Sequence, residues 1–158
     1  MYDTGIGRSC AIILPVELPP AFVIPRLGFK VPAGFPSPAT DYIESRIDLN
    51  RELIQNPTFT FYMYAEGNSM APVINDGALL VVDRKLEPTE GCTVVASVNQ
   101  EYCVKYFFKY PDGSIELRPE NPECSSIFLA DDFEGEFEIF GCVTYFIQKP
   151  THASRRPN

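Results

Sequence analysis

Histidine is almost absent from this sequence: the single one, His152, lies in a polar stretch near the end of the chain. A Ser–His–Asp triad or a Cys–His pair would have to be built on that residue, and a metal site made of several histidines is excluded. Acid–base chemistry near neutral pH would therefore need a carboxylate, lysine, tyrosine or thiol whose pKa is shifted.

Cysteine spacing offers no metal site either. The number of cysteines is odd, and no Cys-x-x-Cys pair occurs. Thiols within apolar runs, as three of these are, are typical of buried, reduced cysteines in a cytosolic protein. We therefore expect no metal and no other cofactor. The five cysteines are Cys10, Cys92, Cys103, Cys124 and Cys142.

Long apolar runs are missing as well. The best candidate, residues 10–24, is interrupted by Pro15, Glu17, Pro19 and Pro20, and it is shorter than the roughly 20 apolar residues that a membrane-spanning helix needs. The stretch also lacks the basic start and the continuous apolar centre of a secretory signal. We expect no membrane association and a cytoplasmic location.

The sequence has fewer basic than acidic residues: 13 Lys and Arg residues against 21 Asp and Glu residues give a net charge of -8. An acidic domain repels phosphate, so strong direct binding to DNA is not expected. The 15 prolines and 10 glycines argue against a helical bundle. Twelve Phe and eight Tyr residues favour half-buried, pleated strands instead.

The chain therefore predicts a mostly β fold: a compact barrel or sandwich of short strands, with an extended N-terminal arm and one short helix. Closely spaced prolines make residues 1–33 the arm, and residues 34–41 are a linker. Strands are expected within residues 58–65, 79–83, 92–98, 102–109, 114–118 and 136–148, with Gly141 as a possible bulge.

The short helix is expected within residues 48–55. Helical spacing would place Leu49, Leu53 and Ile54 on one face, and Asp48 could cap the first turn. The helix would end at the Asn-Pro pair that follows it.

Ser69 follows a predicted aromatic strand and comes two residues after Gly67. A serine in a glycine-relaxed turn can project its hydroxyl beside backbone N–H groups, as a nucleophile next to an oxyanion hole requires. The segment is not the hydrolase GxSxG motif, because Ala71 stands where the second glycine would be. Taken alone, the pattern fits a plain turn serine better.

Lys105 stands alone in the apolar and aromatic run of residues 102–108, and two interpretations are open. On an edge strand, the side chain would extend its ammonium group to water. In a buried position, desolvation lowers a lysine pKa by roughly 3 to 5 units. A neutral amine can then remove a proton from a serine hydroxyl. Lysine could thus be the general base in a chain that has almost no histidine.

Together these features resemble the LexA/UmuD family of serine–lysine self-cleaving peptidases. The resemblance covers residues 34–149, most of the chain, and its specificity comes from several motifs in the expected order. Ser69 and Lys105 are 36 positions apart (105 minus 69), close to the family spacing. The matching segments are residues 34–42 (GFPSPATDY), 46–50 (RIDLN), 53–55 (LIQ), 67–70 (GNSM), 75–77 (NDG), 79–83 (LLVVD), 104–105 (VK) and 138–141 (EIFG).

The resemblance implies roles for individual residues. Ser69 would be the nucleophile, Lys105 the general base, and the backbone N–H groups of Ser69 and Met70 the oxyanion donors. The bond cut would be Ala33-Gly34, so that the arm, residues 1–33, is removed and a peptidase domain, residues 34–158, is left. The small Ala33 suits a tight pocket, and Gly34 allows close backbone approach.

The resemblance also implies partners and a cellular role. Self-cleavage would be stimulated by RecA filaments on single-stranded DNA during the SOS response to DNA damage. The shortened product would form a homodimer and act with a UmuC-type polymerase in error-prone translesion synthesis, which is SOS mutagenesis. Contact with DNA would then come through these partners.

Three alternatives compete with this interpretation. A non-catalytic regulatory interaction module of the same fold would not need both Ser69 and Lys105. A LexA-type repressor fragment would need a helix-turn-helix domain before the cleavage site, where only 33 residues are present. A signal peptidase, which also uses serine and lysine, would need a membrane anchor.

Overall fold

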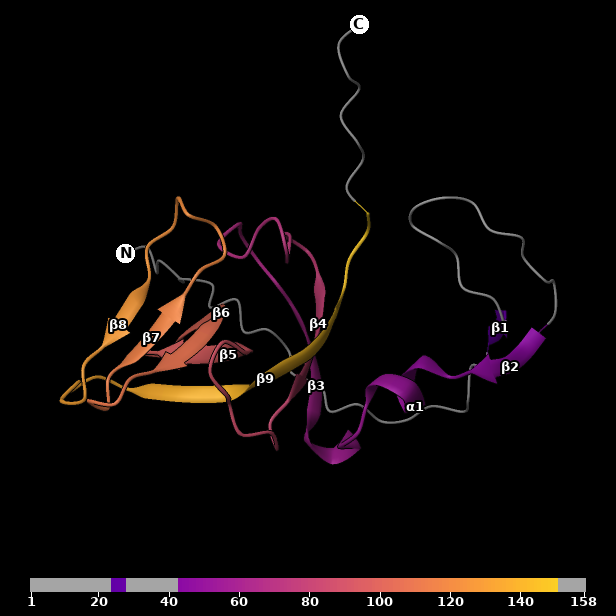
Figure 1. Ribbon diagram of the computed structural model, residues 1–158, viewed down its shortest axis with the longest axis horizontal. Coiled ribbons are helices and arrows are strands. Elements are labelled where there is room, and N and C mark those ends of the chain that lie inside the picture. The colour runs from indigo at the N-terminus through magenta and orange to yellow at the C-terminus, as the bar shows by residue number, and fades with distance from the viewer. Residues whose placement is uncertain (1–23, 28–42, 151–158) are drawn as a thin grey trace, which may run out of the picture.

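The computed structural model describes residues 24–27 and 43–150 of the chain. Seven strands form one antiparallel sheet in the order β3-β4-β9-β5-β6-β7-β8, and β1 and β2 form a separate antiparallel pair beside it (Figure 1). The expectation of a mostly β fold with one short helix is confirmed. The elements are β1 (Ile24–Leu27), β2 (Ile43–Ile47), α1 (Leu49–Leu53), the 3-10 turn η1 (Pro57–Phe59), β3 (Thr60–Tyr64), β4 (Leu79–Asp83), β5 (Thr93–Val98), β6 (Glu101–Lys109), β7 (Ile115–Arg118), β8 (Ile127–Leu129) and β9 (Phe137–Ile147).

The long strand β9 joins two parts of the sheet. Its first half pairs with β5 and its second half with β4, and the register shifts once in each pairing. Figure 1 shows the result: β9 bends, so that β3 and β4 run in a different direction from β5 and β6. The shift against β5 leaves Phe140 without a partner, next to the predicted bulge residue Gly141.

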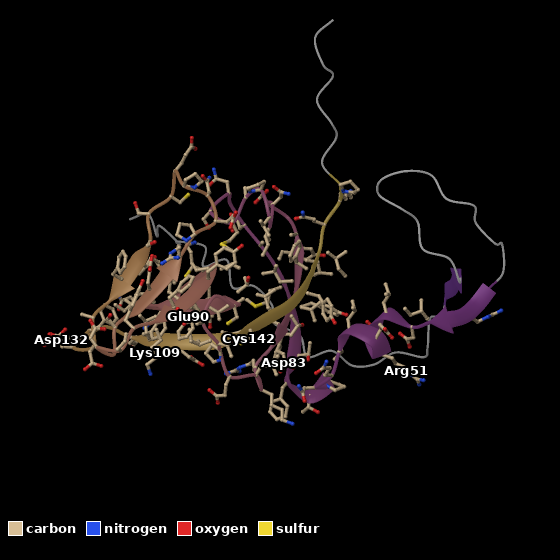
Figure 2. The ribbon with its side chains drawn as sticks, in the orientation of Figure 1. Arg51, Asp83, Glu90, Lys109, Asp132 and Cys142 are labelled. Atoms are coloured by element: carbon tan, nitrogen blue, oxygen red, sulfur yellow. The ribbon has the colours of Figure 1, made fainter. Side chains whose placement is uncertain are left out.

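Gly141 is required by a close approach between strands. A Cβ atom there would lie 2.9 Å from the backbone oxygen of Asp83 and 2.9 Å from the side chain of Val82. Any larger residue would push β4 away from β9. Figure 2 shows Asp83 where β3, β4 and β9 converge, and Cys142 on β9 beside it.

Two apolar clusters hold the sheet together. Alternation along β5 divides them, because Val95 belongs to one cluster while Val94 and Ala96 belong to the other. The first cluster contains Met70, Ile74, Ala78, Leu80, Val82, Val95 and Phe140. The second contains Val94, Ala96, Phe107, Leu117 and Cys142. The first cluster matters for function, since it fixes the loop that carries Ser69.

The six predicted strands are all present, with ends that differ by at most two residues from the expected ranges. β5 and β6 are joined by a two-residue turn, in which Asn99 and Gln100 adopt positive φ values of 50° and 69°. Such left-handed residues are what a two-residue hairpin between twisted strands requires.

Three strands were not predicted. β8 has only three residues and follows a polar, proline-containing stretch, so its pattern is too short to stand out. β2 and β1 pair with each other, and that pairing depends on a contact between segments that are 16 residues apart at its nearest point (43 minus 27). Periodicity within either segment alone carries no such information.

The helix α1 confirms the expected cap but not the expected face. The Asp48 carboxylate accepts a hydrogen bond of 3.0 Å from the backbone N–H of Asn50, as an N-cap residue does. Ile54 is buried, whereas Leu49 is 51% exposed, so the three apolar side chains do not share a buried face. A helix of five residues is too short to turn a full apolar stripe toward the sheet.

Several sequence predictions lie outside the described residues. These are the Ala33-Gly34 bond, most of the arm, the linker at residues 34–41, Cys10 and His152. They stay predictions. Among the described residues, no helix is long and apolar enough to cross a membrane.

Candidate active site

Ser69 lies in the loop of residues 65–78 that joins β3 to β4. Backbone hydrogen bonds of 2.9 Å close the base of this loop, from the N–H of Ala65 to Ala78 and from the N–H of Gly77 to Ala65. Within it, the Asp76 carboxylate accepts a 2.8 Å hydrogen bond from the backbone N–H of Gly67. The loop is therefore tied together at several points rather than spanning freely between the strands.

Buried apolar side chains fix the same loop from below. Met70, Ile74 and Ala78 all belong to the first apolar cluster, beneath the turn that presents Ser69. Gly67 has a φ of +86°, a conformation that glycine adopts at little cost and that lets the chain reverse two residues before Ser69. The predicted arrangement, a serine in a glycine-relaxed turn after a strand, is present in the structure.

Lys105 lies in the interior of the sheet, because its strand β6 has β5 on one side and β7 on the other. Its exposed fraction is only 7%. The interpretation of Lys105 as a water-facing lysine on an edge strand is therefore wrong. β7 pairs with the neighbouring residues Tyr106 to Lys109, and the loop that carries Ser69 meets the Lys105 amine, and neither contact could be seen in the β6 sequence itself.

The structure brings Ser69 and Lys105 together across 36 positions of sequence. The Lys105 Nζ lies 2.7 Å from the Ser69 Oγ and 3.1 Å from the backbone oxygen of Val104. Within the described residues, no carboxylate lies at ion-pair distance from Lys105. The amine therefore has a hydroxyl and a carbonyl as its polar neighbours, without a countercharge.

A cavity of about 200 Å³ opens above this pair, and we call it the Ser69 cavity. Its volume has room for a side chain and the backbone beside it. Burial raises the pKa of the Cys103 thiol in its wall, an effect that the positive charge of Lys105 opposes. A protonated thiol is a poor nucleophile, so Cys103 does not compete with Ser69. Lining residues include Glu66, Gly67, Ser69, Tyr102, Cys103 and Lys105.

The backbone N–H groups of Ser69 and Met70 have no acceptor among the residues that the structure describes. Both therefore have a donor to offer to a bound group, as an oxyanion hole needs. The carbonyl of Ser69 is engaged instead, since it accepts a 3.0 Å hydrogen bond from the backbone N–H of Asn121.

Asn121 is a contributor that the sequence analysis missed. Besides its backbone contact with Ser69, its side-chain Nδ2 donates a 3.2 Å hydrogen bond to the backbone oxygen of Asn68. The segment that follows β7 thus braces the nucleophile loop from a distance of 52 residues in sequence (121 minus 69). The Asn-Pro pair at residues 121–122 indicates a turn, but nothing in it indicates where that turn packs.

The geometry supports one kind of chemistry better than others. A hydroxyl 2.7 Å from a buried amine, next to N–H donors and a small cavity, is the arrangement that a serine nucleophile with a lysine base would need. Among the described residues, no group of three or more side chains could hold a metal ion. The residues present thus suit attack on a carbonyl carbon.

Comparison with known proteins places the chain in a family. The Peptidase S24-like family matches residues 25–144, which is 120 of the 158 residues (144 minus 25, plus 1). The chain belongs to the Peptidase S24-like family. Members of this family are generally serine peptidases, and both Ser69 and Lys105 lie within the matched region.

Individual relatives agree with this placement. Protein SamA of Salmonella typhimurium is 37% identical over 139 residues, which cover 87% of this chain and 94% of SamA. Protein ImpA of Escherichia coli is 37% identical over 130 residues, covering 82% and 86% of the two chains. A LexA repressor of Clostridium perfringens is 36% identical over 109 residues, covering 68% of this chain but 53% of the repressor. The LexA/UmuD resemblance is confirmed.

Proposed function

We propose that the chain is a self-cleaving serine peptidase in which Ser69 is the nucleophile and Lys105 the general base. The observation that carries this proposal is the 2.7 Å separation of the Ser69 Oγ and the Lys105 Nζ, at the foot of a small cavity. Membership in a family of serine peptidases supports it. Lys105 is buried and has no countercharge at ion-pair distance among the described residues, so the Ser69 hydroxyl is a direct polar neighbour of its amine.

The reaction follows from the positions of these groups. The neutral Lys105 amine accepts the hydroxyl proton while the Ser69 Oγ attacks the carbonyl carbon of Ala33. The N–H groups of Ser69 and Met70 donate to the oxyanion that forms. The bond to Gly34 then breaks, and the new amine takes the proton from Lys105. Water hydrolyses the Ser69 ester by the same route, which releases the Ala33 carboxylate and restores the hydroxyl.

The substrate in this proposal is the chain's own segment around Ala33-Gly34. A cavity of about 200 Å³ suits the methyl group of Ala33. The segment lies in sequence between β1 and β2, a pair that stands to one side of the seven-stranded sheet in Figure 1. In this proposal the segment that enters the cavity comes from the same chain or from another copy.

The family placement supports a role in SOS mutagenesis. In that role RecA filaments on single-stranded DNA stimulate cleavage, residues 1–33 leave, and residues 34–158 remain as the working domain. The product forms a homodimer in the cytoplasm and joins a UmuC-type translesion polymerase. The net charge of -8 fits a protein that reaches DNA through partners. Exposed apolar side chains at the end of β9, Tyr145, Phe146 and Ile147, offer surface for such partners.

The proposal is tested by incubating the full chain with RecA filaments assembled on single-stranded DNA and measuring the intact masses of the products. We expect two fragments that correspond to residues 1–33 and 34–158. Ser69→Ala should give no fragments. Lys105→Arg should give none either, because a guanidinium group stays protonated and cannot accept the hydroxyl proton.

Three outcomes would count against the proposal. A different junction would overturn the Ala33-Gly34 assignment, and cleavage by the Lys105→Arg protein would remove the lysine from the mechanism. An intact wild-type chain, under conditions in which the same filaments cleave a LexA repressor, would favour the non-catalytic interaction module.

A further inference from the structure

A second cavity adjoins the Ser69 cavity, and the two share Tyr102. Its volume is about 450 Å³, and we call it the Glu136 cavity. Ser97 pairs with Tyr102 on β6 and with Glu138 on β9, so these three residues form one row across β6, β5 and β9. The two cavities are therefore neighbours along the sheet, separated by the Tyr102 side chain that lines both.

The exposed wall of this cavity is held in place. The Tyr102 side chain is 57% exposed, yet its ring packs edge-on against Phe140, with ring centroids 6.0 Å apart. The Arg84 guanidinium group in turn lies over the Phe140 ring, 4.5 Å from its centre. An exposed aromatic ring that is braced in this way can support a chain laid against it.

The charges in the cavity are unevenly compensated. The Arg84 guanidinium lies 3.3 Å from the Glu138 carboxylate and partly neutralises it. Glu136 accepts a 3.1 Å hydrogen bond from the Gln100 amide, but no cation lies at ion-pair distance from it among the described residues. A bound chain with one positive charge would compensate Glu136.

The segment before the proposed cut carries that charge. Lys30 is the only charged residue between Leu27 and Thr40, and it comes three positions before Ala33. Three residues of extended chain span about 10 Å, and the lysine side chain adds its own length. With Ala33 at the Ser69 cavity, the Lys30 ammonium group can thus reach the neighbouring cavity.

We propose that the Glu136 cavity is the subsite for the residues that precede the cut, where the Lys30 ammonium group pairs with the Glu136 carboxylate. This inference rests on the proposed function, because it requires the chain's own segment as substrate. The occupant is that segment, of the same chain or of a second copy. The pair would help to select which stretch of chain enters the cleft, and the Ser69–Lys105 pair would cut it.

Charge reversal tests the pairing. We would measure first-order cleavage rates of the full chain with RecA filaments at low salt for Lys30→Glu, Glu136→Lys and the double variant. Each single reversal replaces attraction with repulsion at a partly exposed site and should slow cleavage about fivefold to tenfold. The double variant restores an opposite-charge pair and should return to within about twofold of the wild-type rate. Added salt should reduce the loss in the single variants.

Asp132→Lys is the matched control for Glu136→Lys. It changes the net charge by the same amount as Glu136→Lys, at an exposed acidic residue near the tip of the sheet (Figure 2). It does not line the cavity and should cleave at the wild-type rate. Thermal melting of each protein checks that the fold is kept. Wild-type rates in the single variants, or no recovery in the double variant, would overturn the pairing and leave the proposed function standing. Loss of cleavage in the wild type would overturn both.

Discussion

Two polar clusters in this molecule differ in what surrounds them. One is the Ser69–Lys105 pair beside its cavity. The other is centred on Glu116 of β7, whose buried carboxylate accepts hydrogen bonds from Tyr110, Arg118 and Ser126. Arg118 also lies over the Phe108 ring, 4.0 Å from its centre.

The two clusters differ in how many hydrogen-bond and ion-pair partners the buried group has. Every contact of Glu116 comes from a neighbouring donor, and the Arg118 and Tyr110 hydrogen bonds lower its pKa to about 2 against the opposing effect of burial. Among the residues that the structure describes, the polar partners of Lys105 are the Ser69 hydroxyl and one carbonyl. A fully paired cluster stabilises a fold, whereas an underpaired group at a cavity is available for chemistry.

The largest expected effect separates the two clusters by activity. Lys105→Ala should reduce self-cleavage at least about 100-fold, because the base that activates Ser69 is gone. Glu116→Gln should leave the cleavage rate of the folded protein within about twofold, since no atom of Glu116 lines the Ser69 cavity. Single-turnover rates at a temperature where circular dichroism shows both variants to be folded provide the measurement.

A further observation sharpens this prediction. Lys105→Arg keeps the positive charge but cannot accept a proton, so it should be as inactive as Lys105→Ala. A Glu116→Gln protein that is fully folded but inactive would show that the second cluster takes part in the reaction. That result would contradict the division of roles.

The site residues that could be identified from the sequence are those whose neighbours in sequence form a clear pattern. Ser69 follows a recognisable strand and glycine, and Lys105 interrupts a recognisable apolar run, so both could be named together with their strands. The resemblance to a known family then supplied the pairing. Local pattern alone left Lys105 open between an edge and a buried position.

The parts that were missed depend on long-range packing. Whether β6 is an edge depends on β7, and the support of Ser69 depends on Asn121, which lies in a segment with no periodic pattern. The Glu116 cluster is also invisible in sequence, because alternation along β7 does not say that Ser126 will approach it. Such contacts are decided by how the sheet closes, not by any single segment.

The second prediction separates the clusters by stability. Glu116→Gln should lower the free energy of unfolding by about 2 kcal/mol at pH 7. The lowered pKa of Glu116 would correspond to a larger stabilisation if the Glu116–Arg118 ion pair were fully buried. The Arg118 side chain is 45% exposed, however, so water screens the pair and reduces its contribution. Urea unfolding followed by circular dichroism measures the difference. Glu123→Gln, an exposed carboxylate in the following loop, is the control and should change stability by less than about 0.5 kcal/mol.

The pH dependence of this difference has a definite sign. The folded-state pKa of Glu116, about 2, is below its ordinary value of 4.5, so its contribution is present in full above pH 4.5. As the pH falls from 4.5 toward 2, the unfolded chain takes up the proton first, and the contribution is lost. Wild type and Glu116→Gln should therefore converge at low pH. A gap that stays constant from pH 7 to pH 2.5 would show that packing and not charge is responsible.

The smallest expected effect concerns Asn121. This residue could act like the Glu116 cluster, by stabilising the fold, or like the Ser69–Lys105 pair, by taking part in the site. Asn121→Ala keeps the backbone hydrogen bond to Ser69 and removes two side-chain hydrogen bonds. One is donated to the Asn68 oxygen in the Ser69 loop, and the other is accepted from the backbone N–H of Glu123 within the segment of Asn121 itself. One neutral hydrogen bond is worth about 1 kcal/mol, so we expect cleavage to slow about fivefold as the loop loosens. Ser125→Ala, an exposed residue in the same segment, is the control and should cleave normally.

Hydrogen exchange distinguishes a loosened loop from a destabilised protein. In the Asn121→Ala protein, the backbone N–H groups of residues 67–71 should exchange faster, while those of β5 and β9 should keep their protection. Faster exchange throughout the sheet, with cleavage reduced in proportion to the unfolded fraction, would place Asn121 with the Glu116 cluster as a stabilising residue. Slower cleavage with a protected sheet would place it with Ser69 and Lys105, as the residue that positions the nucleophile.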